Sequence, residues 1–476
     1  MGVKIIMAIC FLPCLLIMYG CLYMEGKPKG NIIMGVTLRA EEKDEAGVKQ
    51  IVKRFHREMH VLLLLSLVLF ALTCMPTRDS IVLSTQMIWL VFVLVVFFFP
   101  EAKGNRRLRE WKRERRAACP QQATPQTAEP EIQNAQKVYV DMTAAAAPRS
   151  KPFLKLSLAG LGVSFIPVIG ELFLAREAFY GWWTEGTLLI LFLCGLLCCL
   201  LQWRFWRMST DVVSLRSEVN IQLARVRQYQ WSRFWSIMIW CTALLIFLMW
   251  YGMHRPKAFL FLILGGVCLY TLAAAVAALF TERNVRRAYG KYTETSEFQV
   301  EEDDHWIYGM FYYNRNDSRF MVNKRVGIGT TVNMAKTSAK VFTGVILAGT
   351  LALLLWAAGF VLLEDFATIS LKVADSTVIS AQYQEEYRIE ISDIQSVELV
   401  DTLPSMSKRV GSSMDTLLKG SFLSEGYVSC KVCVRRQKPP FVKITATDGM
   451  VYYLNDEEAH ATVDVYEELR QMLGSK

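Results

Sequence analysis

The sequence EDDHWIYGMFYYNRNDSRFMVNKRVGIGTTVNMA, residues 302–335, is neither an apolar span nor an ordinary charged loop, and we call it the aromatic loop. It has an acidic start, a basic end and six aromatic side chains. These are Trp306, Tyr308, Phe311, Tyr312, Tyr313 and Phe320. Turn-forming residues at 314–318 predict two short strands, or a strand and a turn, around them. Aromatic rings with one polar edge suit a membrane–water boundary. We expect a folded cytoplasmic loop with its own aromatic core or, alternatively, a ligand-binding surface.

The remainder of the chain has the composition of a membrane protein. Of 476 residues, 53% are hydrophobic and 20% are charged, and the mean hydropathy is positive. About 20 apolar residues are needed to cross a hydrocarbon core of ~30 Å. Eight candidate spans of this kind are predicted. They are 5–24, 61–75, 81–99, 153–175, 187–203, 236–253, 258–280 and 341–363. The second is short, and Pro167 and Gly170 interrupt the fourth. The predicted fold class is therefore an α-helical polytopic membrane protein.

The distribution of Lys and Arg predicts the orientation of the spans. Four longer loops, 25–60, 101–152, 204–233 and 281–340, carry 35 of these residues, whereas the short turns between spans carry four. Basic loops stay on the cytoplasmic side. The N-terminus and the tail from Glu364 are accordingly expected outside the plasma membrane.

The net charge of +9 divides in the same way, because residues 364–476 carry a net charge of −6. The positive remainder is expected to lie against anionic lipid head groups of the inner leaflet. The run RRLREWKRERR at 106–116 predicts a lipid-facing helix beside a span rather than a nucleic-acid site. We expect no nucleic-acid partner.

The chain divides into six predicted regions. They are 1–116 with three spans and a basic inner loop, a flexible linker at 117–150, 151–300 with four spans, the aromatic domain at 301–340, the eighth span at 341–363, and a β-rich domain at 364–476. Two amphipathic helices, at 41–60 and 212–231, are predicted in inner loops.

The tail changes to the alternating pattern of half-buried strands. The predicted strands are 367–373, 387–400, 427–436 and 441–455, the last containing an Asp448-Gly449 hairpin turn. A helical apolar stripe follows Asn455. This order predicts a small β-barrel closed by one helix. The stretch VKITATDGMVYYLN and the final helix resemble the bacterial pleckstrin-homology-like domains. That resemblance implies a scaffold and does not imply lipid binding.

The aromatic loop carries a second resemblance, through the pattern W-I-x-G-x-x-Y-x-N-x-x-D-x-R followed by K-R-x-G-x-G. The matching residues are Trp306, Gly309, Tyr312, Asn314, Asp317, Arg319, Lys324, Arg325, Gly327 and Gly329, with a weaker echo at 31–57. The pattern resembles a short domain of multi-pass membrane proteins from Gram-positive bacteria, relatives of the immunity and signal-transducing proteins of the sporulation-delay toxin system. The resemblance implies non-enzymatic sensing, sequestration or immunity-type binding at the membrane.

Residues with catalytic or metal-binding patterns are sparse. No nucleophile motif, carboxylate pair or cofactor fingerprint is present, so we predict no enzyme activity, no cofactor and no metal. Cys430 and Cys433 form a C-x-x-C in a predicted strand, where they would point to opposite faces. A bond between them would require a bulge. His56 and His60 share a helix face but lack a third ligand.

Glu171 is a charged residue inside a predicted span. An ionisable group at the middle of a bilayer costs ~2.5–3.5 kcal/mol and marks a functional site by default. Glu171 lies near the outer end of its span, however, so an interfacial carboxylate is the favoured interpretation.

Two functional classes remain open. The first is non-enzymatic binding, and the alternative is transport of a small solute or peptide through the helix bundle at Glu171. The expected partners are the lipid bilayer, anionic head groups at the inner face, and a protein or peptide. Arg319, Lys324 and Arg325 are expected to contact those head groups or an acidic partner. The candidate functional residues are Glu171, Trp306, Tyr312, Asn314, Asp317, Arg319, Lys324 and Arg325.

The orientation can be measured with a reporter that is active only in the cytoplasm. Fused after Asn333 it should be active, because that position lies in a basic loop, and fused after Lys476 it should be silent. The opposite pair of activities would reverse the predicted topology.

Overall fold

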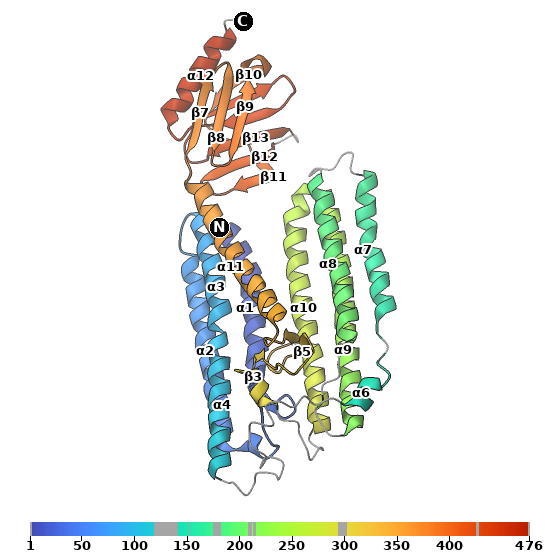
Figure 1. Ribbon diagram of the computed structural model, residues 1–476. Helices are drawn as coiled ribbons and strands as arrows, with labels where there is room; N and C mark the ends of the chain where they lie inside the picture. The colour runs from blue at the N-terminus through green and yellow to red at the C-terminus, as the bar shows by residue number, and fades with distance from the viewer. Residues whose placement is uncertain are drawn as a thin grey trace. The chain divides into compact units, whose positions relative to one another are not determined.

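The computed structural model describes residues 2–118, 141–150, 152–174, 182–207, 212, 216–293, 302–424 and 428–474. Within these residues, eight helices are long and apolar enough to cross a membrane, as predicted. They are α1 (Gly2–Tyr23), α2 (Ala46–Thr73), α3 (Asp79–Val96) with its continuation α4 (Phe98–Ala118), α7 (Leu154–Leu174), α8 (Trp182–Trp206), α9 (Ser217–Met253), α10 (Pro256–Thr293) and α11 (Thr337–Phe366) (Figure 1).

Several of these helices extend well beyond their apolar segments. The amphipathic helices predicted at 41–60 and 212–231 are not separate elements, because α2 and α9 each run without a break into a span. Neither helix contains a proline. Continuing an existing helix costs less than starting a new one, since the nucleation cost is incurred once. The polar N-terminal ends of these two helices are therefore helical extensions of the candidate spans rather than loops.

Part of the predicted linker is folded. Residues 119–140 lie outside the described part of the chain, but residues 142–146 form α6. The Asp141 carboxylate caps this helix by accepting from the Ala144 amide at 2.9 Å. It also accepts from Ser217 Oγ at 3.0 Å and Asn220 Nδ2 at 2.9 Å, at the start of α9. The end of the predicted linker is thus attached to α9.

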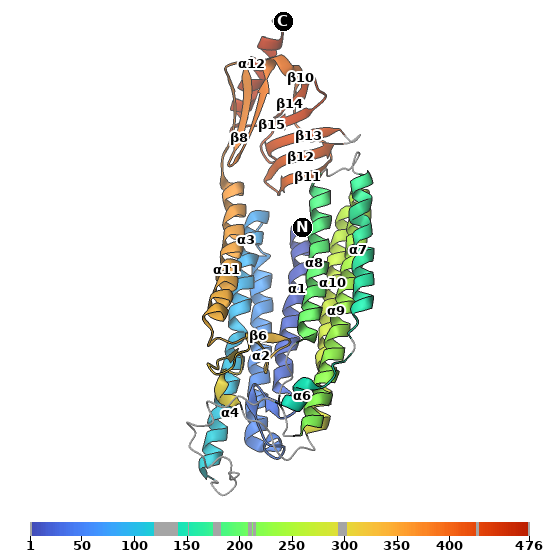
Figure 2. The ribbon, with the colours of Figure 1, turned by 45° about the vertical axis from the view of Figure 1, so that its right-hand side comes forward.

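The chain divides into two compact units, residues 1–5, 69–91 and 351–476, and residues 6–68 and 92–350. In the second unit, α9 packs against α7, α8 and α10 (Figures 1 and 2). Val168, Leu188 and Ile246 form a buried cluster there. Because these contacts are made by apolar side chains, they position the helices without charged groups.

The tail belongs to the first unit and contains two sheets, of which the smaller is antiparallel and the larger is mixed. The smaller sheet has the order β7 (Ile369–Ala374), β8 (Thr377–Gln382), β9 (Glu385–Glu390). The larger has the order β10 (Ile394–Val400), β14 (Phe441–Ala446), β15 (Val451–Leu454), β13 (Ser429–Arg435), β12 (Leu417–Ser424), β11 (Met406–Ser413), with β13 and β15 parallel. The described strands therefore form two sheets and do not close into the single barrel that the sequence pattern predicts.

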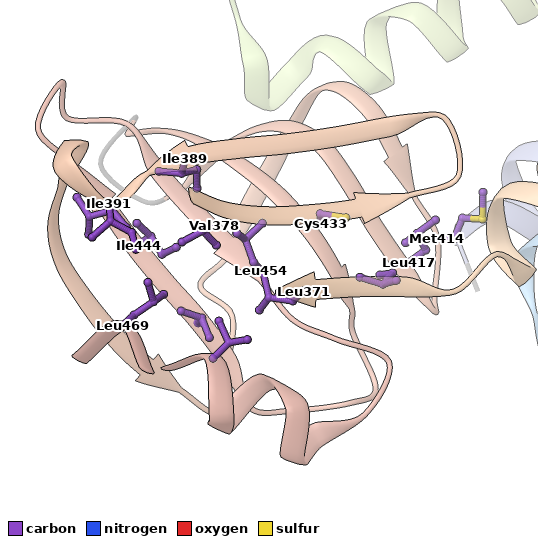
Figure 3. Close-up of a cluster of buried hydrophobic side chains, with 14 residues drawn as sticks. Leu371, Val378, Ile389, Ile391, Met414, Leu417, Cys433, Ile444, Leu454 and Leu469 are labelled. Carbon is purple, nitrogen blue, oxygen red and sulfur yellow. The ribbon is translucent and has the colours of Figure 1, made fainter. Parts of the chain in front are cut away.

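The core of the tail lies between these sheets and the last helix, α12 (Ala459–Gly474). Figure 3 shows Val378, Ile444 and Leu454 pointing toward one another from the two sheets, with Leu469 contributed by α12. Burying a side chain of this size contributes roughly 1.5–3 kcal/mol. The predicted C-terminal helix is confirmed, and its apolar stripe completes the core.

The two cysteines of β13 occupy opposite faces of the sheet, as predicted from their spacing. Cys433 belongs to the core shown in Figure 3, whereas Cys430 packs in a second buried cluster with Phe422 and Val432. Both thiols are free, and burial raises the pKa of each to about 11. They act as small apolar side chains.

The tail is attached to the membrane helices of its own unit by buried polar contacts at the end of α11. Asp365 accepts hydrogen bonds from Ser80 of α3 and from Thr416 in the turn before β12, and it lies 3.5 Å from Arg435 of β13. The neighbouring Glu364 accepts from Ser412 Oγ at 2.7 Å. Asp365 is 1% exposed, so these partners are needed to compensate for its burial.

Candidate functional site

Two β-hairpins form the centre of the candidate site, with two residues connecting the strands of the first and three connecting those of the second. The first joins β1 (Ile32–Ile33) to β2 (Val36–Thr37), and the second joins β3 (Trp306–Ile307) to β4 (Phe311–Tyr312). In each turn a bulky residue and a glycine have positive φ, 44° and 75° at Met34-Gly35 and 52° and 72° at Tyr308-Gly309. Positive φ at both central residues is the signature of tight hairpin turns that fit strand twist. The turn in the aromatic loop and the turn in the weaker matching segment at 31–57 therefore have the same pair of positive φ angles.

The two hairpins touch through their glycines. A Cβ atom added to Gly35 would lie 2.6 Å from the Cα atom of Gly309, and one added to Gly309 would lie 3.1 Å from Gly35 Cα. Asn105 of α4 donates to the Met34 carbonyl at 2.7 Å and lies beside both glycines. No larger residue fits at either position without moving the backbone.

A buried carboxylate, Asp303, connects the same segments. It stands in the short 3-10 turn Asp303–His305 before β3 and is 6% exposed. Thr37 donates to it from its backbone amide at 3.1 Å and from Oγ1 at 2.8 Å. Lys112 of α4 donates at 2.8 Å, and Arg325 also forms an ion pair with it. We call Thr37, Lys112, Asp303 and Arg325 the Asp303 cluster.

The charges in the Asp303 cluster determine its protonation. Burial alone would raise the pKa of Asp303, but Arg325 and Lys112 hold that pKa far below its usual range. The cations are fixed in turn, since Lys112 donates to the Thr37 carbonyl at 2.5 Å and Arg325 to the Gly35 carbonyl at 3.2 Å. Arg109 of α4 donates to the backbone carbonyls of Asp303 and Trp306. The cluster is an ionised, fully hydrogen-bonded structural element.

The remainder of the aromatic loop folds on a small core of Trp306, Tyr312 and Val322. The two aromatic rings are 5.2 Å apart, and Val322 belongs to β5 (Met321–Asn323), which pairs with β6 (Thr330–Val332). The fold with an aromatic core, one of the two sequence expectations, is present.

Polar predicted residues close the turn between β4 and β5. Tyr312 Oη donates to Asp317 at 2.9 Å, and Arg319 pairs with the same carboxylate at 2.6 Å. Asn333 Nδ2 donates to the carbonyls of Asn314 at 2.7 Å and Asp317 at 3.1 Å. These side chains hold the loop in shape, which leaves little of their hydrogen-bonding capacity for a ligand.

Two residues of the aromatic loop differ from expectation. Arg325 was expected at a lipid or partner surface, but it is 8% exposed and neutralises Asp303. Lys324 is half-buried, and burial lowers its pKa against the opposing effect of Glu25. The basic end of the loop is therefore largely structural.

Glu171 lies apart from the other seven candidates, in α7. It is fully buried and accepts from Trp250 Nε1 at 3.0 Å, while His254 Nε2 lies 3.5 Å away. Its second oxygen, Oε1, has no hydrogen-bond partner among the described residues. The group is thus covered by α9, and the interpretation of Glu171 as an interfacial carboxylate stays a prediction.

The residues of α4 that assemble the site were not predicted from the sequence. Lys112 and Arg109 belong to the run that predicted a lipid-facing helix, yet both bind the aromatic loop. Only other members of that run, such as Arg106 and Arg113, are exposed. The i, i+4 periodicity of α4 could have indicated that one face of this helix is buried and the other is exposed.

The architecture described so far is that of a predominantly helical chain with eight candidate membrane spans, a folded aromatic loop and a C-terminal region of sheets. Residues 315–340 match the model of a family of unknown function, DUF5808. This match includes Asp317, Arg319, Lys324 and Arg325. No curated protein and no solved structure matches the chain.

Replacing Asp303 by Asn should loosen the aromatic loop, because Lys112 and Arg325 would remain buried without a counter-charge. Losing one partner of a buried ion pair costs about 3–5 kcal/mol. The rate of proteolysis of the loop in inverted membrane vesicles measures the effect. Because the folded-state pKa is depressed, the stabilisation is fully present above the ordinary Asp pKa of about 3.9 and should be lost only at lower pH.

The exposed neighbour Asp304 provides the matched control, since Asp304→Asn removes the same charge without touching the cluster. Equal cleavage rates in the two variants would show that Asp303 does not hold the loop.

Proposed function

We propose that this chain is a bacterial plasma-membrane protein that acts without catalysis, by binding a peptide or protein partner at the inner face of the membrane. Sensing, sequestration and immunity-type binding are the roles that fit. The observation that supports this proposal is the conformation of Tyr308 at the tip of the β3–β4 hairpin. Its backbone has φ 52°, and its side chain is 49% exposed.

A bulky residue with positive φ is strained, at a cost of roughly 1–2 kcal/mol. Met34 occupies the corresponding place in the first hairpin, but its side chain is fully buried and gains packing energy in return. Tyr308 has no comparable burial, and glycine would relieve its strain. Strain that the fold does not require is a reason to infer function.

Tyr308 is part of an apolar surface with a rigid support. Ile307 and Phe311 are 45% and 37% exposed beside it, while Trp306 and Tyr312 on the same hairpin are buried. The Asp303 cluster fixes the base of the hairpin. A preorganised apolar surface loses little entropy on binding, which favours a peptide ligand.

The charge beside this surface favours a basic peptide over lipid. Asp304 is exposed next to β3, and a carboxylate there is repelled by the anionic inner leaflet. Contacts with anionic head groups fit better on the exposed arginines of α4, Arg106 and Arg113. We therefore assign the hairpin surface to a partner with apolar and basic residues.

For the tail, we propose a pleckstrin-homology-like scaffold outside the membrane. Two sheets that share one core with a C-terminal helix support this relation. The outward placement of the tail and of the N-terminus is supported by the distribution of Lys and Arg in the loops.

The alternative function, transport through the helix bundle, is favoured by one observation. Glu171 is buried between α7 and α9 with one oxygen unpartnered. A partly satisfied carboxylate within a bundle of apolar helices could bind a solute.

A photo-reactive amino acid in place of Tyr308 should give a discrete polypeptide adduct in irradiated cells. The same amino acid at Tyr229 of α9, which is 44% exposed, is the control and should not give that adduct. Asp304→Lys should lower the yield, because it repels a basic partner. Adducts with lipid alone, or the same adduct at both positions, would refute binding of a partner at the hairpin.

The transport alternative predicts that Glu171→Gln abolishes solute uptake into proteoliposomes while membrane insertion is retained. Glu110→Gln on the exposed side of α4 is the control and should leave uptake unchanged. Uptake that survives Glu171→Gln would exclude Glu171 as the transport site.

A further inference from the structure

Glu101, in the first turn of α4, is a buried carboxylate with no use in the proposed function. It is 1% exposed, and neither of its oxygens has a hydrogen-bond partner among the described residues. A buried ionised carboxylate without partners is among the most costly groups in a protein. Such a group must either gain a ligand or lose its charge.

The charged residues around Glu101 are already paired with one another. Arg286 of α10 forms ion pairs with Glu25, which follows α1, and with Glu282 at 3.1 Å. Lys29 pairs with the same Glu282 carboxylate at 3.1 Å. Glu25 and Glu282 are each 2% exposed, and Arg286 is 8% exposed. Lys29 and Arg286 are therefore already paired with Glu25 and Glu282. Glu101 is a third carboxylate that has no paired cation.

The charge balance of this cluster depends on Glu101. Lys29 and Arg286 are paired with Glu25 and Glu282, and Lys324 acts on Glu25, so an ionised Glu101 would be a third carboxylate without a hydrogen-bonded cation among the described residues. Glu25 and Arg286 are the charges that act on Glu101 directly, the first with the same sign.

Two further titratable groups lie close to this cluster. The half-buried Lys324 acts on Glu25, and the ring of His56 stacks on Tyr23 at 4.1 Å. No group of three or more His, Cys, Asp or Glu that could hold a metal ion is found among the described residues. A proton is therefore the cation that fits Glu101.

We propose that Glu101 is a proton-binding site that couples the packing of the buried start of α4 to the pH of the adjacent aqueous phase. In the packed state the carboxyl carries its proton and is uncharged. On release the O–H bond breaks, the proton passes to water, and the carboxylate keeps the electron pair. The added negative charge is repelled by Glu25 and weakens the packing around the start of α4. This inference is independent of the partner-binding proposal.

The thermal stability of the full-length protein in lipid nanodiscs tests the site. The unfolding midpoint of the wild type should fall as rising pH ionises Glu101. Glu101→Gln, the neutral isostere, should fold and should keep a higher midpoint with a smaller fall. Glu110→Gln on the same helix, where the side chain is exposed and pairs with Arg106, should behave as wild type. His56 is common to all three proteins, so its titration cancels in the comparison.

Infrared spectroscopy of the same samples identifies the bound cation. The wild type and Glu110→Gln should show the carbonyl stretch of a protonated carboxylic acid that disappears at high pH, and Glu101→Gln should lack it. An unchanged band in Glu101→Gln, an equal pH dependence of stability in all three proteins, or failure of Glu101→Gln to fold would overturn the proposal. A wild-type midpoint that rises with Na⁺ or K⁺ at constant pH, but not in Glu101→Gln, would assign a metal cation and overturn the proton.

Discussion

The ion pairs of the buried Asp303 carboxylate are the interaction on which the two hairpins and α4 depend. The carboxylate joins residues 37, 112 and 325, which belong to three separate segments of the chain. The contact between the glycines of the two hairpins provides only close packing. The carboxylate also fixes the orientation of its partners, because each of them must reach one of its oxygens. Without it, two buried cations would remain unpaired, so the hairpins and α4 are stable together or not at all.

These contacts also restrict the topology. Residues that touch must lie on the same side of the membrane, and two candidate spans separate Thr37 from Lys112 while four separate Lys112 from Asp303. Both numbers are even, as contact requires. The same holds for Asp141 and Asn220, which are bonded across α7 and α8. These contacts are therefore compatible with the prediction that the basic loops share one side of the membrane.

Elements with a strong local pattern could be predicted from the sequence. The eight spans followed from apolar length, and the strands β13 to β15 and helix α12 followed from their alternation and their stripe. β11 and β12 lack such a pattern: MSKRVGSS is largely polar and exposed, and LLKGSFLS is buried on both faces. A strand of either kind owes its place to its neighbours rather than to its own residues.

The site was harder to predict because its key contacts join residues distant in sequence. Lys112 and Asp303 are 191 residues apart, and nothing local distinguishes this lysine from its exposed neighbours. Trp306 and Tyr312 were identified because aromatic residues in a charged loop are unusual in themselves. Glu101 was overlooked because it follows an apolar run, where a carboxylate is normally solvated. The charges that act on it, Glu25 and Arg286, come from distant parts of the sequence.

The junction at the end of α11 has a mechanical consequence for the tail. Only Ala367 and Thr368 separate α11 from β7, and Asp365 is held from both sides, by Ser80 of α3 and by residues of the tail. A flexible tether would let a domain search the space around it. A domain fixed in this way cannot rotate independently of the helices to which it is attached. A force or torque applied to the tail would pass into α3 and α11, and the tail would change its orientation only together with those helices.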